Sequence, residues 1–218
     1  DPKNIYVVSV MPCIAKKFER QREEMKVNGL WDVDSVITTR ELARMIKQAN
    51  IEFDKLEDET FDSPMGEATG AAAIFGVTGG VMEAALRTAY EIITGEELKK
   101  LEFEDIRGSK GIKKATVQIG DKEVKVAVAH GLSNARKIME EIKNGTSDYQ
   151  FVEVMACPGG CIMGGGQPIK SSKTRMTVDV AAKRAEAMYS IDERSTIRKS
   201  HENPIMKQIY KEREEYRI

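Results

Sequence analysis

One short segment, residues 153–168, constrains this chain more than any other part of it. It reads Glu-Val-Met-Ala-Cys-Pro-Gly-Gly-Cys-Ile-Met-Gly-Gly-Gly-Gln-Pro and holds Cys157 and Cys161, two of the three cysteines in the protein. The apolar run at residues 151–155 leads into it and predicts a buried strand. The glycines that follow predict a backbone that passes close to a bulky neighbour.

The third cysteine, Cys13, has a similar setting. A β-branched run at residues 5–10 predicts a strand, which Met11 and Pro12 end immediately before the cysteine. Two strand ends therefore each deliver thiols into a loop, which is where ligands bind in α/β folds.

The composition argues against several classes of partner. With 218 residues, the chain is long enough for one large or two small domains with a real core. Its formal net charge of −1, with 32% charged residues, argues against nucleic acid or an anionic membrane as the main partner. The sequence has no transmembrane run and no signal peptide, and an odd number of cysteines does not make a disulfide framework. We therefore expect a reduced, cytoplasmic protein.

Apolar periodicity and turn signals predict strands that alternate with helices. Strands are expected at residues 5–10, 34–38, 112–119, 124–129 and 151–155, and those at residues 112–119 and 124–129 are expected to form a β-hairpin. Helices are expected at residues 15–27, 39–49, 81–94, 133–143, 178–189 and 204–215. This order predicts an α/β fold with largely parallel sheets flanked by helices.

Local signals suggest several of these boundaries. The segment Thr38-Thr39-Arg40-Glu41 has the spacing of a capping box, and Ser133 is expected to cap the helix that follows it. Asn28-Gly29 is expected to end the first helix. Residues 51–70 are acidic and rich in turn-forming residues, so little regular structure is expected there.

A glycine-rich stretch at residues 69–80 precedes the predicted helix at residues 81–94. A turn of this kind could cradle an anion on its backbone N–H groups at the helix start. The stretch lacks the spacing of a Walker A motif or a dinucleotide fingerprint. Close packing of the helix start against another element is an equally good interpretation, so both stay open.

Three chemistries are open to cysteines in such loops. Zinc is disfavoured because structural zinc sites show paired short spacings, and neither His130 nor His201 lies near a cysteine in the sequence. Cys13, close to Lys16 and Lys17, could be a nucleophile with His130 as its base, although a satisfied polar residue at a strand end is the preferred interpretation of His130. An iron–sulfur cluster fits best, although such clusters normally take four thiolates and this sequence offers three.

Two long motifs carry a family resemblance. Residues 11–19, Met-Pro-Cys-Ile-Ala-Lys-Lys-Phe-Glu, resemble the MPCxxKxxE motif of iron-only (FeFe) hydrogenases. Residues 153–168 resemble their ExMACxxGCxxGGGQP motif, and residues 74–87 resemble a further stretch of the same catalytic domain. Two such motifs in the right order are highly specific, and the resemblance covers nearly the whole chain.

The resemblance implies a particular cofactor, the H-cluster. In this family it is a 4Fe–4S cubane joined through a cysteine thiolate to a two-iron unit with CO, cyanide and dithiolate ligands. Cys13, Cys157 and Cys161 match three of the four cubane ligands, and Cys161 also matches the thiolate that bridges to the two-iron unit.

The resemblance also implies roles for residues other than the cysteines. Lys16 matches the lysine that hydrogen-bonds a cyanide ligand, a favourable arrangement because the ammonium group and the anion attract each other. Met11 and Met155 match apolar residues that line the two-iron pocket, and Phe75 lies in a segment that approaches it. Glu19 is interpreted either as pairing with a basic group or as a carboxylate near a helix N-terminus.

One family motif is absent from these residues. TSCCPxW, which supplies the fourth cubane ligand and a cysteine that passes protons, does not occur. Together with the start at Asp1, this predicts a fragment or a processed chain, the C-terminal portion of a two-lobed catalytic domain. Residues 1–192 are assigned to that domain and residues 193–218 to a charged helical tail, and the isolated chain is expected to be inactive.

The function that the resemblance implies is the reversible oxidation of dihydrogen to protons and electrons. Ferredoxin or an NAD-linked subunit would carry the electrons, and the missing N-terminal part or another chain would supply the fourth cluster ligand. The first alternative is a non-catalytic iron–sulfur protein of the hydrogenase-like cluster-assembly class. The second is a hydrogen sensor on the same scaffold.

Overall fold

The computed structural model describes residues 1–62, 66–108 and 110–215, and the chain divides into two compact units. The first unit comprises Asp1–Glu59 and Cys161–Val178, and the second comprises Thr60–Gly160 and Asp179–Ile218. Part of the predicted acidic loop, residues 63–65, lies outside the described residues. In the described parts, no helix is both long and apolar enough to cross a membrane.

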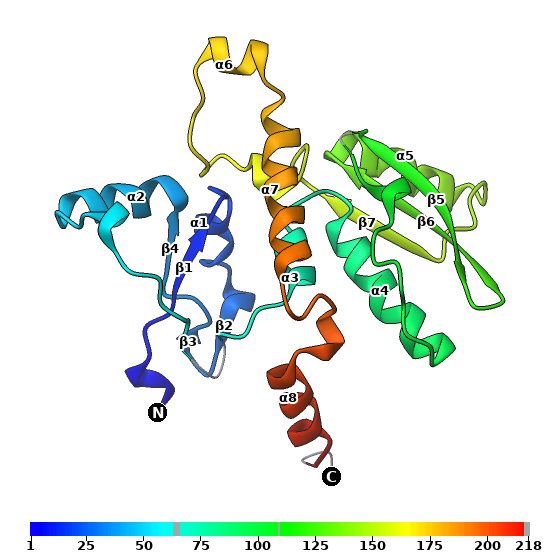
Figure 1. Cartoon of the computed structure of the whole chain (residues 1–218), viewed down its shortest axis with the longest axis horizontal. Coiled ribbons are helices and arrows are strands. Elements are labelled where there is room, and N and C mark those ends of the chain that lie inside the picture. Colours follow the sequence, from blue (N-terminus) through cyan, green and yellow to red (C-terminus); the bar gives the residue numbers. More distant parts are fainter. Residues whose placement is uncertain (63–65, 109, 216–218) are drawn as a thin grey trace. The chain divides into compact units, whose positions relative to one another are not determined.

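The first unit is built on a two-stranded parallel sheet (Figure 1). Strand β1 pairs with β4 in the register Val8↔Ser35 to Met11↔Thr38. The capping box predicted at Thr38 is present and starts α2. The helices and strands of this unit are β1 (Val8–Met11), α1 (Lys16–Glu19), β2 (Lys26–Val27), β3 (Leu30–Trp31), β4 (Ser35–Thr38), α2 (Thr39–Gln48) and α6 (Ser172–Thr177). Short 3-10 turns lie at Pro2–Asn4, Glu23–Met25, Phe53–Lys55 and Cys161–Met163.

The first unit has almost no apolar core of its own. Ile162, 5% exposed, is its one buried apolar side chain within the described ranges. Val8 and Val10 of β1 are 49% and 43% exposed, and Met45 on α2 is 51% exposed. A sheet face of this composition normally packs against another layer.

The helix predicted at residues 15–27 is wrong beyond its first turn. Helix α1 ends at Glu19, and the chain then enters an antiparallel hairpin in which Lys26 pairs with Trp31. Asn28 and Gly29 have φ angles of 52° and 80°, so this dipeptide makes the hairpin turn rather than a helix stop. Asn-Gly suits such a turn because both positions need a left-handed backbone.

The second unit contains a three-stranded sheet in the order β5-β6-β7. The hairpin β5–β6 is antiparallel and the pair β6–β7 is parallel, which confirms the α/β class. Its helices and strands are α3 (Gly70–Ile74), α4 (Gly80–Thr94), β5 (Ile112–Ile119), β6 (Lys122–His130), α5 (Leu132–Lys143), β7 (Phe151–Met155), α7 (Val180–Arg194) and α8 (Pro204–Glu215). Further 3-10 turns lie at Glu104–Ile106 and Ser200–Glu202.

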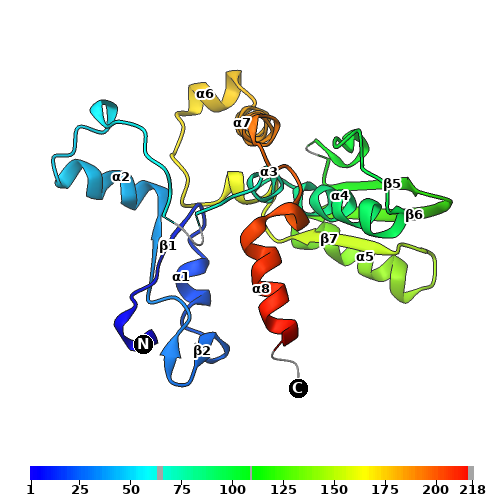
Figure 2. The ribbon, with the colours of Figure 1, turned by 60° about the horizontal axis from the view of Figure 1, so that its bottom comes forward.

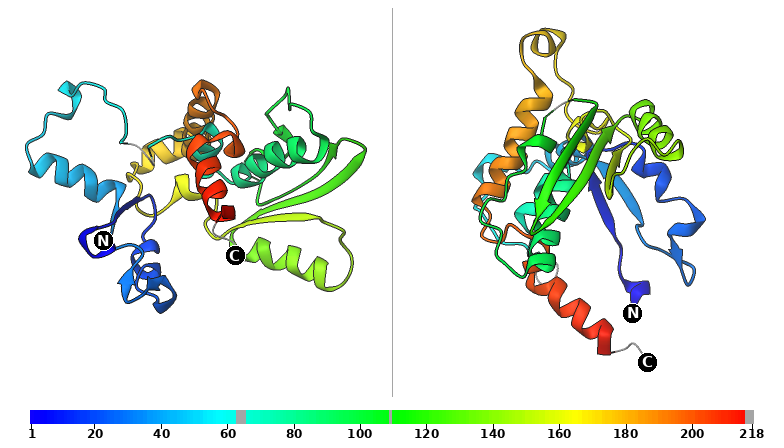
Figure 3. Two further views of the ribbon diagram at one scale, coloured as in Figure 1. Left: turned by 90° about the horizontal axis from the view of Figure 1, so that it is seen from below. Right: turned by 90° about the vertical axis from the view of Figure 1, so that its right-hand side faces the viewer.

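Successive side chains of β6 point to opposite faces of this sheet, and a helix covers each face (Figure 3). Val126 and Val128 pack with Met82 and Leu86 of α4 on one face. Ala127 and Ala129 pack with Ile138 of α5 on the other. A strand covered on both faces needs apolar side chains on both, and the buried run Val126 to Ala129 in β6 supplies them.

Two helix starts differ from expectation. Helix α5 begins at Leu132 with Gly131 as its N-cap, so Ser133 lies inside the helix and is not its cap. Helix α7 begins at Val180, where Asp179 accepts a hydrogen bond from the Ala182 N–H, and it continues to Arg194.

Helix α3 lies against α7 (Figure 2), and the missing side chain of Gly70 makes room for Asp192.

A buried ion-pair network ties α4 to α7. Arg87 donates two hydrogen bonds of 2.8 Å to the Asp192 carboxylate and one of 2.7 Å to Glu83, and all three side chains are fully buried. Arg198 and Arg107 each add an ion pair, to Asp192 and to Glu83. Burial alone would raise the pKa of Asp192, but the hydrogen bonds from Arg87 and Arg198 outweigh it and lower the pKa.

Replacing Arg87 should therefore destabilise the second unit strongly. In Arg87→Met, two buried carboxylates lose their main partner, a change that costs about 3–5 kcal/mol in unfolding free energy. Urea unfolding followed by circular dichroism measures it, since the only tryptophan, Trp31, lies in the other unit. Lys183→Ala is the control, because it removes only an exposed i,i+3 pair with Glu186 and should cost less than about 1 kcal/mol. Equal losses in the two variants would contradict the role given to Arg87.

Candidate metal centre

Cys13 lies directly after strand β1, in the first unit. The strand ends at Met11, Pro12 follows, and α1 begins three residues after the cysteine. Cys13 is partly buried and does not form a disulfide. The parallel pairing of β1 with β4 holds the strand end from which this loop leaves.

The loop that follows Cys161 packs against the Cys13 loop through bare backbone. In this triple-glycine loop (residues 164–166), Gly166 N–H donates a 2.9 Å hydrogen bond to Pro12 O. A Cβ on Gly164 would lie 2.1 Å from Pro12 O, and one on Gly166 would lie 3.0 Å from Met11 O. Glycine is needed at positions 164 and 166 because no side chain fits there between the two backbones. Gly164 N–H also donates to Cys161 O at 2.9 Å, so the first unit brings the loops of Cys13 and Cys161 together.

Arg40, which the sequence analysis did not single out, holds the other side of the triple-glycine loop. Its guanidinium donates a 2.8 Å hydrogen bond to Gly165 O, and its backbone N–H donates to Gly166 O at 3.3 Å. Arg40 lies in the first turn of α2, where the capping box was the only visible signal. Nothing in the local sequence indicates that its side chain reaches residues more than a hundred positions away.

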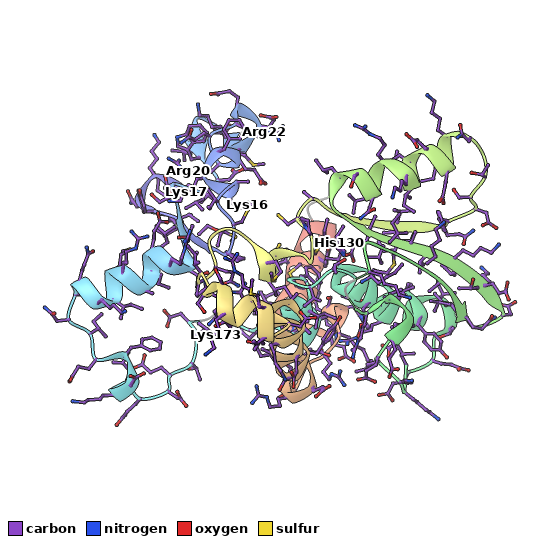
Figure 4. The ribbon with its side chains drawn as sticks, turned by 90° about the horizontal axis from the view of Figure 1, so that it is seen from above. Lys16, Lys17, Arg20, Arg22, His130 and Lys173 are labelled. Carbon is purple, nitrogen blue, oxygen red and sulfur yellow. The ribbon has the colours of Figure 1, made fainter. Side chains whose placement is uncertain are left out.

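Lys16 and Glu19 form an ion pair on α1, with Nζ and Oε1 2.7 Å apart. Glu19 therefore pairs with a basic group and also lies in the first turn of α1, so both interpretations of this carboxylate hold. Lys16 and Met11 contribute to the lining of a cavity of about 170 Å³, together with Arg20 and Asp32. Figure 4 shows Lys16, Lys17, Arg20 and Arg22 as a basic group on α1 and the turn after it.

Cys157 follows strand β7 in the second unit. Gly159 N–H donates a 3.1 Å hydrogen bond to His130 Nδ1, and Gly160 N–H donates to Cys157 O at 3.1 Å. His130 ends β6, opposite Met155 in the parallel register, and it is 8% exposed. The preferred interpretation of His130, a satisfied polar residue at a strand end, is confirmed, and Figure 4 labels its position.

The glycine turn (residues 76–80) answers the question that the sequence left open. Glu153, 6% exposed, accepts hydrogen bonds of 2.7 Å from both Gly79 N–H and Met82 N–H at the start of α4. The anion at this helix start is therefore the protein's own carboxylate. Close packing is also present, because a Cβ on Gly80 would lie 1.7 Å from Ile74 O. Neither residue type nor spacing had indicated Glu153 as the partner.

Phe75 and Met155 also belong to the second unit. Phe75 follows α3 directly and is 43% exposed. Met155 is partly buried, and its Sδ lies 3.1 Å from the position that a Cβ on Gly160 would take. Met155 therefore borders the Cys157 loop (residues 157–160) within this unit.

A second group of possible metal ligands does not form a usable site. Ligand atoms of Glu91, His201 and Glu202 lie within 4.8 Å of one another. Lys199 Nζ, however, lies 2.6 Å from Glu91 and 3.2 Å from Glu202. An ammonium group already supplies the positive charge in this cluster, which is therefore an ion-pair network.

The three cysteines offer soft sulfur ligands of the kind that iron–sulfur clusters and other thiophilic metal groups bind. Cys13 is partly buried, Cys157 and Cys161 are exposed, and none forms a disulfide. Thiolates in glycine-lined loops give soft sulfur ligands and room for a bulky inorganic group.

Comparison with known proteins identifies the family. Residues 1–165 match the family described as "Iron only hydrogenase large subunit, C-terminal domain". The chain belongs to the iron-only hydrogenases. Residues 178–214 match a second family, "Iron hydrogenase small subunit", so α7 and α8 correspond to a segment that is classified separately.

Individual relatives support this assignment. The NADP-reducing hydrogenase subunit HndD of Solidesulfovibrio fructosivorans is 55% identical over 95% of this chain and 35% of its own length. The periplasmic [Fe] hydrogenase large subunit of Nitratidesulfovibrio vulgaris is 57% identical over 78% of this chain and 40% of its own. A solved structure of the [FeFe]-hydrogenase HydA1 from Chlamydomonas reinhardtii has a TM-score of 0.73 and 39% identity, covering 96% of this chain and 59% of that one. The chain thus spans well under half of these two curated relatives.

More distant relatives extend beyond hydrogenases. Protein NAR1 of Arabidopsis thaliana is 35% identical over 95% of this chain and 46% of its own length. Other relatives at about this distance are named as cytosolic iron–sulfur cluster assembly factors. The higher identity lies with the hydrogenases.

Gly164→Ala should disturb the packing between the two cysteine loops of the first unit. The new Cβ would meet the Pro12 carbonyl, which is backbone and cannot move aside cheaply, so we expect a loss of about 1–3 kcal/mol. Gly165→Ala is the matched control, because its Cβ meets only the flexible Ile14 side chain at 2.9 Å. Urea unfolding followed by Trp31 fluorescence compares the two variants. A loss that is as large for Gly165→Ala would argue against the backbone contact.

Lys113 should make stability depend on pH. Burial lowers the pKa of Lys113 to about 8, although Glu153 attracts its charge, whereas an unfolded lysine titrates near 10.4. Between these values the unfolded chain binds the extra proton, so unfolding free energy rises with pH across this window, by up to about 3 kcal/mol. The gain is lost as the pH falls through about 8. Urea titrations should show this rise in the wild type and not in Lys113→Met; parallel curves would count against it.

Proposed function

We propose that this chain is the C-terminal part of a hydrogenase catalytic domain that interconverts dihydrogen with protons and electrons. The observation that carries the proposal is the packing of the triple-glycine loop on Pro12, since it joins the loops of Cys13 and Cys161. These two loops come from the two motifs that are typical of the family. Membership in the iron-only hydrogenases supports the same conclusion.

In this proposal the three cysteines hold the H-cluster. Cys13, Cys157 and Cys161 ligate its 4Fe–4S cubane, and Cys161 also bridges to the two-iron unit. When bound, the two-iron unit with its CO, cyanide and dithiolate ligands supplies the redox chemistry. The chain supplies the thiolates, their placement and a dry surrounding.

Other side chains orient the cofactor and shield it. Lys16 donates a hydrogen bond to a cyanide ligand and would exchange its present partner, Glu19, for that anion. Met11, Met155 and Phe75 line the two-iron pocket and exclude water from it. These roles come from the family resemblance, and the partly exposed Phe75 is in keeping with a side chain that faces a bound group.

The partners of the whole protein are part of the proposal. A fourth thiolate comes from a preceding segment or from another chain, and ferredoxin or an NAD-linked subunit carries the electrons. The scarcity of buried apolar side chains in the first unit supports a covering partner. We place the protein in the cytoplasm, although one relative is periplasmic. Residues 1–192 form the catalytic part and residues 193–218 a charged helical tail.

A non-catalytic role in iron–sulfur cluster assembly is the second candidate, and the similarity to Protein NAR1 favours it. A hydrogen sensor on the same scaffold would use the same ligands. The intact Gly164-Gly165-Gly166-Gln167-Pro168 segment and Lys16 favour the enzyme.

Anaerobic reconstitution of this chain tests the ligand set. With an exogenous thiol as fourth ligand, iron and sulfide analysis and EPR should detect a cubane in the wild type. Cys13→Ala and Cys157→Ala should each lose most of it, because two thiolates do not retain a cubane. Ala156→Ser, which changes the neighbour of Cys157 but no thiol, is the matched control. Full occupancy in Cys13→Ala would remove that residue from the ligand set.

Turnover in the complete hydrogenase separates enzyme from assembly factor. Cys161→Ala should abolish hydrogen production there, since it removes the thiolate that bridges to the two-iron unit. A complete protein that holds the cubane but evolves no hydrogen would favour the second candidate.

A further inference from the structure

The buried carboxylate of Glu153 neither binds metal nor lines the cofactor pocket in the proposed function. Its contacts point to a different role. It lies on β7, two residues before Met155 and four before Cys157. Its two hydrogen bonds of 2.7 Å both go to backbone N–H groups at the start of α4, from Gly79 and Met82. These groups have no partner within the helix, so the carboxylate replaces the water that they would otherwise bind.

Lys113 holds the carbonyl side of the same glycine turn. Its Nζ donates to Thr78 O at 2.9 Å and to Gly108 O at 3.1 Å, and the side chain is 5% exposed. The charge of Glu153 stabilises the Lys113 ammonium, so the two buried side chains support each other. The turn is therefore held from both directions, by a carboxylate on its N–H groups and by an ammonium on a carbonyl.

The Cys157 loop lies against this turn. A Cβ on Gly160 would be 2.7 Å from Gly76 O and 2.8 Å from Thr78 N, so the two backbones touch directly. On the other side, His130 Nδ1 accepts the Gly159 N–H. Any shift of the glycine turn must therefore move residues 159 and 160, which connect Cys157 to Cys161.

We propose that Glu153 is a positioning residue for the metal centre. Its carboxylate fixes the glycine turn, the turn supports the Cys157 loop, and the loop sets where the Cys157 thiol lies. Only the nature of the group that Cys157 binds rests on the proposed function. The positioning itself concerns the protein alone and can be measured without a cluster.

Glu153→Gln is the informative substitution. The glutamine amide has one acceptor oxygen, so one of the two N–H groups would face the NH2 donor instead. Glu91→Gln, on helix α4, is a closely matched control, because Glu91 also accepts a backbone N–H, from Leu98, and pairs with a lysine, Lys199. The polar contacts of Glu91 in the described part of the chain go to Leu98, Lys199 and His201, none of which lies in the Cys157 loop, so its loss should affect only stability. Glu153→Asp, which keeps the charge on a shorter side chain, serves if Glu153→Gln does not fold.

The measurement is amide hydrogen exchange by NMR on the metal-free chain, with urea unfolding as the stability reference. In Glu153→Gln, exchange at Gly159 and Gly160 should accelerate about tenfold or more, together with Gly79 and Met82. Glu91→Gln should leave these four amides within about twofold of the wild type. In Glu153→Asp the same four amides should accelerate, by a smaller factor. Faster exchange at Gly79 and Met82 with unchanged Gly159 and Gly160 would overturn the proposal.

Iron content after anaerobic reconstitution gives the second readout. Glu153→Gln should bind several-fold less iron than Glu91→Gln of equal folded fraction, and equal iron content would again overturn the positioning role. If the wild type itself binds no iron, the proposed function fails, while the exchange of Gly159 and Gly160 still decides the role of Glu153.

Discussion

Direct contact between backbone and backbone is the constraint on which both cysteine-bearing units depend. In the first unit, Gly164 and Gly166 lie against Pro12 at distances that exclude any Cβ. In the second unit, Gly160 lies against the turn at residues 76–80 in the same way. Such contacts fix loop positions more rigidly than side-chain packing, because no rotamer change can relieve them. In the proposed metal centre, this rigidity would hold the cysteine loops in position.

Buried charge is the second principle of the structure. Glu83 and Asp192 share Arg87, and Glu153 takes two backbone N–H groups with Lys113 nearby. Each carboxylate would be costly if it were unpaired; Glu83 is paired within its own helix and by Arg107, whereas Asp192 and Glu153 depend on groups from distant parts of the chain. The Arg87 network connects α4 to α7, and therefore joins the segment matched to the large subunit with the segment matched to the small subunit.

The two units differ in how complete they are. The second has a sheet with a helix on each face and apolar side chains buried between the layers. The first has a two-stranded sheet with exposed valines and an amphipathic helix that buries none of its residues completely. Its order rests on hydrogen bonds, the capping box at Thr38 and the triple-glycine loop. This contrast agrees with the chain spanning only part of its relatives.

The sequence by itself determined the family, the α/β class, strand β7, the β5–β6 hairpin and the capped helix α2. These follow from local patterns, namely two long motifs, apolar alternation and a capping box, which need no distant partner to be recognised. Other features depended on tertiary structure. Asn28-Gly29 forms a hairpin turn because β3 pairs back onto β2, and the anion at the start of α4 is Glu153, 71 positions from Met82 in the chain. Arg40 reaches Gly165 across 125 positions. Contacts between residues so far apart in the sequence form only when the whole chain folds, so a local pattern of residues cannot predict them.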